Sequence, residues 1–208
     1  RRAYEHPDTK TEIGLAVLDD GGKTLCNATI ELTVTNPKGN TKMLKTSDGS
    51  IDKNPKCVDK GVTNNFDYTA PYTTGPSGTY TLHVVASTAN GQRTLDDSFE
   101  VRDHVDFDVE RTDFSMRIYP PAPYPSNITI TSNVDYQGTV RDTVPSSFIL
   151  SDISDKGTTQ TSGRNQVITW NVDWKAGEKH VLGYTIKYPN VSPEFYLLGP
   201  LTIGDPAA

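Results

Sequence analysis

The chain has 208 residues, a formal net charge of −6 and intermixed acidic and basic side chains. Its length fits one large β domain or two domains of about 100 residues, and ordinary domain sizes favour two. The lack of a basic footprint argues against nucleic acid as a partner. No apolar run approaches the roughly 20 residues of a membrane helix, and the start at Arg1-Arg2, without an initiator Met or signal core, suggests a processed or excised piece.

The first half of the chain is a series of short alternating runs separated by turn signals. Residues 1–10 lack such alternation and are expected to form a lead-in arm. Residues 28–34 alternate apolar and polar side chains, as a half-buried strand does, and Asn90-Gly91 is a strong two-residue hairpin signal. The other strands expected here are 12–18, 42–46, 66–72, 79–86 and 93–102.

Residues 47–65 form a long segment with little periodicity that contains Cys57. Because Cys26 and Cys57 are the only cysteines, a single pairing is available, and we expect a disulfide between them. A segment of this length in a compact domain usually has a function or a covalent tie. The bridge would contribute about 3 kcal/mol in the entropic account, and its reduction should loosen this segment first.

Residues 103–113 are interpreted as a seam between two domains. Acidic side chains gather there, at Asp113 and at the four positions Asp103, Asp106, Asp108 and Glu110. Calcium prefers six to eight oxygen ligands, and alternation places the last three of these side chains on one face, opposite Phe107 and Val109. The sequence therefore raises calcium as the one candidate cofactor. The simpler alternative is that these residues, with Arg111, only solvate an edge strand.

The second half continues the all-β pattern. Residues 120–125, Pro-Pro-Ala-Pro-Tyr-Pro, exclude helix and central-strand pairing, so we expect an extended edge or a loop. No segment has a convincing amphipathic helical pattern, and the spacing of the strands is typical of a sandwich. The strands expected here are 128–134, 138–144, 147–150, 166–174, 180–188 and 195–203. The predicted class is all-β, with domains at 11–102 and 114–208.

Several motifs carry a resemblance to known domains. In the second half they are Asp142-Thr-Val-Pro-Ser-Ser-Phe148, Ile168-Thr-Trp170 and Lys175-Ala-Gly-Glu178. They resemble the conserved-repeat domain of large bacterial cell-surface proteins. In the first half, Gly78-Thr-Tyr80 resembles the tyrosine corner of immunoglobulin-like sandwiches. The resemblance implies two immunoglobulin-like β-sandwiches in tandem, which serve as extracellular modules.

Candidate sites for sugars come from two patterns. Formal N-glycosylation sequons begin at Asn27, Asn127 and Asn190, although a chain rich in Thr and Asn also produces such triplets by chance. Exposed aromatic rings can stack on sugar faces, and the rings considered for such a platform are Tyr119, Tyr124, Tyr136 and Trp174, together with Tyr188. Parity places Trp170 and Trp174 on one strand face, and Trp170 is expected in the core.

No catalytic pattern emerges. The four histidines lack metal-ligand spacing, and no nucleophile elbow or phosphate-binding loop is present. The sequence predicts a non-enzymatic structural module of an extracellular, cell-surface protein or of a filament-like assembly. Its expected partners are other domains of a larger surface protein or copies of itself, and the chain carries no membrane span. The alternative function is an adhesin or a carbohydrate-binding module.

Overall fold

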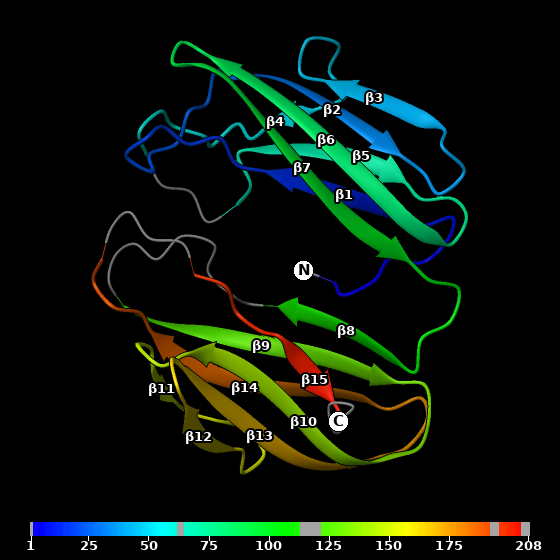
Figure 1. Cartoon of the computed structure of the whole chain (residues 1–208), viewed down its shortest axis with the longest axis vertical. Coiled ribbons are helices and arrows are strands. Elements are labelled where there is room, and N and C mark those ends of the chain that lie inside the picture. The colour runs from blue at the N-terminus through cyan, green and yellow to red at the C-terminus, as the bar shows by residue number, and fades with distance from the viewer. Residues whose placement is uncertain (1, 62–64, 113–121, 192–195, 205–208) are drawn as a thin grey trace. The chain divides into compact units, whose positions relative to one another are not determined.

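The computed structural model describes residues 2–61, 65–112, 122–191 and 196–204 (Figure 1). These residues contain strands, turns and bends but no helix, so the predicted all-β class is confirmed. The chain groups into two compact units. The N-terminal unit is Ala3–His104, and the C-terminal unit is Val105–Ala208 together with Arg1–Arg2. The division falls within the predicted seam. No helix in the described part of the chain is long and apolar enough to cross a membrane.

The N-terminal unit consists of a four-stranded and a three-stranded antiparallel sheet that share one core. The larger sheet has the order β3-β2-β6-β7, with bounds Thr41–Lys45, Thr29–Thr35, Gly78–Thr88 and Gly91–Val101. The smaller sheet has the order β1-β5-β4, with bounds Lys10–Leu15, Tyr68–Thr73 and Asp52–Lys53. Alternation in β2 buries Ile30, Leu32 and Val34 completely, as the period-2 pattern predicts.

Tyrosine hydroxyls form hydrogen bonds with the backbone near the ends of strands in this unit. Tyr80 Oη accepts a hydrogen bond from the Gly75 amide at 2.9 Å and donates to the Pro76 carbonyl at 3.1 Å. This is the local hydrogen bonding that the tyrosine-corner motif predicts. Tyr68, on the smaller sheet, accepts from the Ala28 amide and donates to the Leu25 carbonyl, next to the start of β2. Tyr68 therefore connects the two sheets.

The predicted disulfide between Cys26 and Cys57 is confirmed, with an S–S distance of 2.02 Å and a Cα–Cα distance of 5.8 Å. It joins the segment before β2 to the segment between β4 and β5. Asp59 reinforces the same joint, because its Oδ1 accepts a hydrogen bond from the Cys26 amide at 2.6 Å. The long aperiodic segment is thus held to the larger sheet by a covalent bond and a charge-assisted hydrogen bond.

The C-terminal unit packs two four-stranded antiparallel sheets around a second core. One sheet has the order β12-β13-β10-β15, with bounds Thr158–Ser162, Asn165–Trp174, Tyr136–Pro145 and Leu201–Ile203. The other has the order β11-β14-β9-β8, with bounds Ile149–Ser151, Lys179–Lys187, Pro123–Ser132 and Phe107–Thr112. Trp170 is fully buried in this core, as predicted.

The two sides of β9 are paired over different lengths in the described residues. Pro123 and Pro125 pair with Lys187 and Thr185 of β14. The pairing of β9 with β8 on its other side ends at Asn127. Within the described residues, the proline-bearing end of β9 therefore has a strand on one side only, as expected for an extended edge, since proline has no amide hydrogen to donate to a second strand. Residues 120 and 121 lie outside the described ranges.

The first ten residues are partly paired. Arg2 forms an isolated antiparallel bridge with Glu110 in the C-terminal unit, and Glu5 forms a parallel bridge with Val101 in the N-terminal unit. Regular strand structure begins at Lys10. Within the predicted seam, Phe107–Thr112 forms β8, an integral strand of the C-terminal unit.

Removal of the disulfide by C26S/C57S should destabilise the N-terminal unit by about 3 kcal/mol, because the unfolded chain regains the freedom of a loop with a sequence separation of 31. Urea unfolding of the two forms would measure the difference. In the serine variant, amide hydrogen exchange should be faster at residues 47–61 than at the strands of the larger sheet. Equal stability of the oxidised chain and the serine variant would contradict this account.

Candidate functional site

The four acidic residues predicted to bind calcium lie at the division between the units. Asp103 belongs to the N-terminal unit, and the other three belong to the C-terminal unit. Asp108 accepts a hydrogen bond from Arg2 Nη2 at 2.8 Å. In the described residues, no group of three or more His, Cys, Asp or Glu side chains is positioned to hold a metal ion. Calcium binding by Asp103, Asp106, Asp108 and Glu110 stays a prediction.

The predicted alternation in this stretch is correct: Phe107 and Val109 pack against the core of the C-terminal unit. Arg111, two residues further on, has the same parity and also points inward, where it binds Asp142. The interpretation of Arg111 as a solvated edge residue is therefore wrong. An inward charge at this position needs a partner, because burial of an isolated charge is costly.

The three predicted sequons differ in their surroundings. Asn27 is exposed, but its amide donates to Asp59 Oδ2 at 2.9 Å and its oxygen accepts from Lys53 Nζ at 3.2 Å. Asn127 lies in the middle of β9 opposite Gly183, where an added Cβ would come within 2.5 Å of Asn127 Oδ1. Asn190 is exposed in a bend, and the third residue of its sequon lies outside the described ranges. Glycosylation at these positions stays a prediction.

Of the rings predicted to form a platform, Trp174 belongs to the core of the C-terminal unit and Tyr136 packs against that core. Trp174 is 4% exposed and stacks on the His180 ring at 4.7 Å, so it offers no free face to a sugar. Tyr136 is half-buried beside Trp174 and Phe107. Tyr124 is half-buried, 6.1 Å from the ring of Tyr188. Tyr119 lies outside the described residues. The placement of Trp174 on an exposed platform is therefore wrong, and its parity with Trp170 explains its burial.

A buried polar cluster joins the two sheets of the C-terminal unit. Arg111 Nη2, on β8, donates to both carboxylate oxygens of Asp142, on β10, at 2.8 and 2.9 Å. Arg111 Nη1 donates to Ser126 Oγ at 3.1 Å and to Tyr184 Oη at 2.9 Å. Tyr184 in turn donates to Asp142 Oδ2 at 2.6 Å. We call these four residues the inter-sheet bracket.

Burial dominates the electrostatics of the inter-sheet bracket. Asp142 is completely buried, and loss of solvation raises the pKa of its carboxyl, although the Arg111 guanidinium and the Tyr184 hydroxyl act in the opposite direction. Burial and the nearby Asp142 also raise the pKa of Tyr184, so its hydroxyl keeps its proton and acts as a donor. Arg111 Nη2 contacts both carboxylate oxygens of Asp142, and charge-assisted hydrogen bonds of this kind are stronger than neutral ones. Asp142, Ser126 and Tyr184 are buried and the Arg111 side chain is 15% exposed, which suits a structural role.

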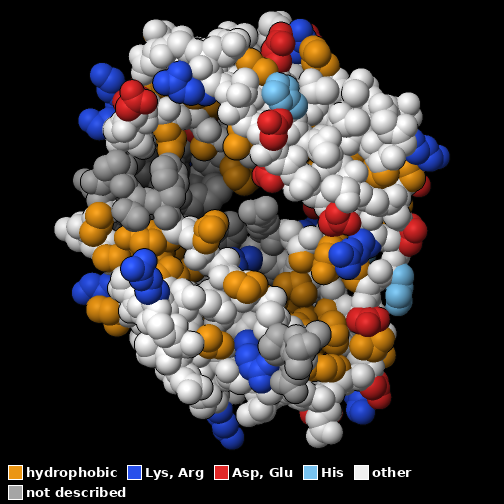
Figure 2. Space-filling model, viewed as in Figure 1, with side chains coloured by type: hydrophobic (Ala, Val, Ile, Leu, Met, Phe, Trp, Pro, Cys, Tyr) orange, Lys and Arg blue, Asp and Glu red, His pale blue; other side chains and the backbone are white. Residues whose placement is uncertain are grey.

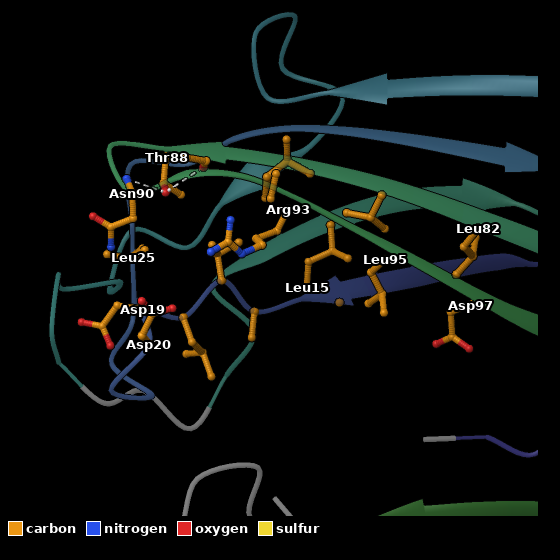
Figure 3. Close-up of a pocket in the computed structure, with 18 of the residues that line it drawn as sticks. Leu15, Asp19, Asp20, Leu25, Leu82, Thr88, Asn90, Arg93, Leu95 and Asp97 are labelled. Atoms are coloured by element: carbon orange, nitrogen blue, oxygen red, sulfur yellow. Dashed lines mark hydrogen bonds between the residues drawn. The ribbon is translucent and has the colours of Figure 1, made fainter. Parts of the chain in front are cut away.

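A solvent-accessible groove lies in the N-terminal unit, with a volume of about 340 Å³ (Figure 3). Its lining includes Leu15 of β1 and Leu82 of β6, together with Arg93, Leu95 and Asp97 of β7. Concave sites with an apolar lining and a few polar groups are typical of binding sites. This groove is the candidate binding site of the unit, and no signal in the first half of the sequence pointed to it.

The groove lies beside the inward face of β7. Arg93, Leu95 and Asp97 pair in register with Ala86, Val84 and Leu82 of β6. Those three β6 residues contact the core, so their β7 partners share the inward face of the larger sheet. Leu95 is nevertheless 60% exposed. The facing sheet has three strands against four, and this part of the edge strand β7 is left uncovered.

Charged side chains are dispersed over the face of the molecule shown in Figure 2, with acidic and basic groups intermixed. This distribution agrees with the absence of a basic footprint in the sequence. A nucleic-acid interface would gather Lys and Arg on one stripe or patch.

Comparison with known proteins identifies no family. No family model matches the chain, and no curated protein matches it. Among solved structures, chitinase ChiA74 from Bacillus thuringiensis aligns with 14% identity and a TM-score of 0.28, over 96% of this chain and 28% of that one. A point mutant of Salmonella alpha-2-macroglobulin aligns with 17% identity and a TM-score of 0.31, over 88% of this chain and 12% of that one. This chain thus spans less than a third of either protein.

A double-mutant cycle should show strong coupling within the inter-sheet bracket. R111M and D142L each leave one buried charge without its partner, and we expect each to cost about 3–5 kcal/mol of unfolding free energy. The double variant should cost less than the sum, by about 1–3 kcal/mol. Chemical denaturation of the C-terminal unit would measure all four corners of the cycle.

The exposed pair of Lys175 and Asp135, 3.1 Å apart, provides the matched control. The corresponding cycle with K175M and D135L should show much weaker coupling, because solvent screens exposed pairs. Additive effects of R111M and D142L would contradict the assigned role of the bracket.

Proposed function

We propose that this chain is a non-enzymatic structural module of an extracellular surface protein or of a filament-like assembly. The observation that carries the proposal is that each unit ties its two sheets together with more than apolar packing. In the C-terminal unit the tie is the pair of Arg111 and Asp142 with Tyr184. In the N-terminal unit it is the disulfide between Cys26 and Cys57, together with Tyr68. Such ties resist separation of the sheets.

The extracellular location is part of this proposal and rests on the disulfide. Disulfides form and persist mainly in oxidising compartments outside the cytosol. The disulfide between Cys26 and Cys57 is the only intrachain disulfide that two cysteines can form. A module that works outside the cell keeps such a bond, since the thiol-reducing systems of the cytosol are absent there.

Force spectroscopy tests the structural role. When the full chain is pulled from its ends, we expect two discrete unfolding steps. Reduction should lengthen the extension of the N-terminal unit by about 100 Å, because the disulfide shields residues at a separation of 31, each worth about 3.5 Å of extended chain. The step that is unchanged in length by reduction belongs to the C-terminal unit, and D142N should lower its force.

Two outcomes would count against the structural role. Extension at low force without discrete steps would mean that the chain does not bear load. An unchanged unfolding force in D142N would mean that the inter-sheet bracket does not contribute to resistance. A serine-to-alanine change at the exposed Ser151 is the matched control, and it should leave both steps unaltered.

An adhesin or carbohydrate-binding module is the second candidate, favoured by the groove of the N-terminal unit. If this function is correct, a glycan array should show binding by the full chain. L95K should abolish that binding, because it places a flexible charge in the groove. Binding that survives L95K, or an array without any signal, would contradict an adhesin acting through this groove.

A further inference from the structure

Strand β7 has a long free edge. It is the last strand in the order β3-β2-β6-β7. On its other side, Glu5 bridges Val101, with hydrogen bonds that also use Glu100 and Arg102. Within the described residues, the stretch 91–98 therefore has a strand on one side only, and all eight of its residues are exposed. Free edges of this length offer a row of backbone groups to another chain.

The inward face of this edge carries one charge of each sign around a leucine. Arg93, Leu95 and Asp97 occupy consecutive positions on that face. Figure 3 shows Leu95 and Asp97 on the same side of β7. Within the described part of the chain, neither charge pairs with another side chain. Arg93 Nη1 donates to the Gln92 carbonyl, and Asp97 Oδ1 accepts from the Ser98 amide.

This order of side chains is complementary to itself when read in the opposite direction. In an antiparallel pair of two β7 strands centred on Leu95, Arg93 of each copy faces Asp97 of the other, and the two leucines meet on the twofold axis. We propose that the free edge of β7 binds the same edge of a second copy of this chain, which makes a symmetric dimer with a continuous sheet. Cross-strand pairs of opposite charge stabilise such a ladder, and like charges oppose it.

Charge also selects the register. A shift of the pair by four residues in one direction places Asp97 opposite Asp97, and the same shift in the other direction places Arg93 opposite Arg93. A shift by two residues places a charged side chain opposite Leu95. Inward-facing charges on an edge usually prevent pairing with other sheets. Here they favour the centred register over these shifted ones, so the interface is specific.

Twofold symmetry also favours a second copy of this chain as the partner. An edge-to-edge interface with a twofold axis closes on itself and uses the same surface on both copies. The exposed side of Leu95 is then covered by an identical leucine. The dimer supplies a partner for the structural module proposed above, and its existence is tested independently of the module's resistance to force.

Analytical ultracentrifugation of the full chain tests whether the dimer forms. The concentration should be raised to about 1 mM, so that weak association is also detected. The wild type should form a dimer. In the centred register R93D sets two acidic side chains opposite each other, and D97R sets two basic ones opposite each other, so each single variant should remain monomeric. The double variant R93D/D97R restores opposite charges and should regain the dimer. These residues are exposed, so near-UV circular dichroism should confirm that every variant keeps its fold.

Mixing the two single variants gives the decisive measurement. The chain with two acidic positions complements the chain with two basic positions, so R93D and D97R should form a heterodimer although each alone is monomeric. The variant L95C should crosslink two copies on oxidation, because the two positions meet on the axis. D152N, at an exposed position of the other unit, is the matched control and should dimerise as the wild type does.

Other outcomes would overturn the proposal. A wild-type chain that stays monomeric up to the highest concentration would contradict the dimer. A dimer that persists unchanged in both R93D and D97R would place the interface elsewhere.

Discussion

Each unit depends on the mutual burial of two inward sheet faces, which is nearly complete at the middle strands and incomplete at the edge strands β7 and β12. In the C-terminal unit four strands face four, and the inward residues of the middle strands β9, β10, β13 and β14 are nearly all buried, whereas the edge strand β12 is exposed along its whole length. In the N-terminal unit four strands face three, and β7 is left with an exposed inward leucine. Burial of apolar area is the main favourable term in both cores.

A polar group that is buried between the two sheets must find its hydrogen-bond partners within the protein. Asp142 lies at an inward position of β10 and is fully buried, so its carboxylate needs hydrogen bonds to replace water. Arg111 and Tyr184 provide them from the opposite sheet. Because a buried ion pair is weak evidence for net stability, the value of this arrangement lies in its geometry. The pair fixes how β8 and β10 lie relative to each other, and a slip of either strand would leave two charges unpaired.

Most of the fold could be predicted from the sequence, because alternation directly reports burial in a sandwich. The strand at 28–34, the hairpin at Asn90-Gly91 and the fully buried Trp170 all follow from period-2 patterns or turn chemistry. The disulfide followed from the presence of only two cysteines. Short strands such as β4 and β12 were missed, because two to five polar residues carry too little periodicity to be recognised.

The polar sites were harder to predict, since a charged residue in a strand usually indicates the solvated face. The informative signal was parity. Arg111 follows Phe107 and Val109 on the same face, and Asp142 follows Val140 on its own strand. A charge at an inward position can be satisfied only by a partner across the core or by a partner from outside. The distances between charged groups on the two facing sheets decide between these two cases, and the sequence does not contain those distances.

Two inward arginines of this chain illustrate both cases. Arg111 lies under a complete second sheet and has its carboxylate within the same unit, 2.8 Å away. Arg93 lies where the second sheet ends, and the acid that matches it, Asp97, is on its own strand four residues along. Two residues on one face of a strand at that spacing are too far apart to pair directly. They can pair across an antiparallel twofold axis, where each meets the opposite charge, and therefore the incomplete cover of β7 is a reason to expect a second chain at that edge.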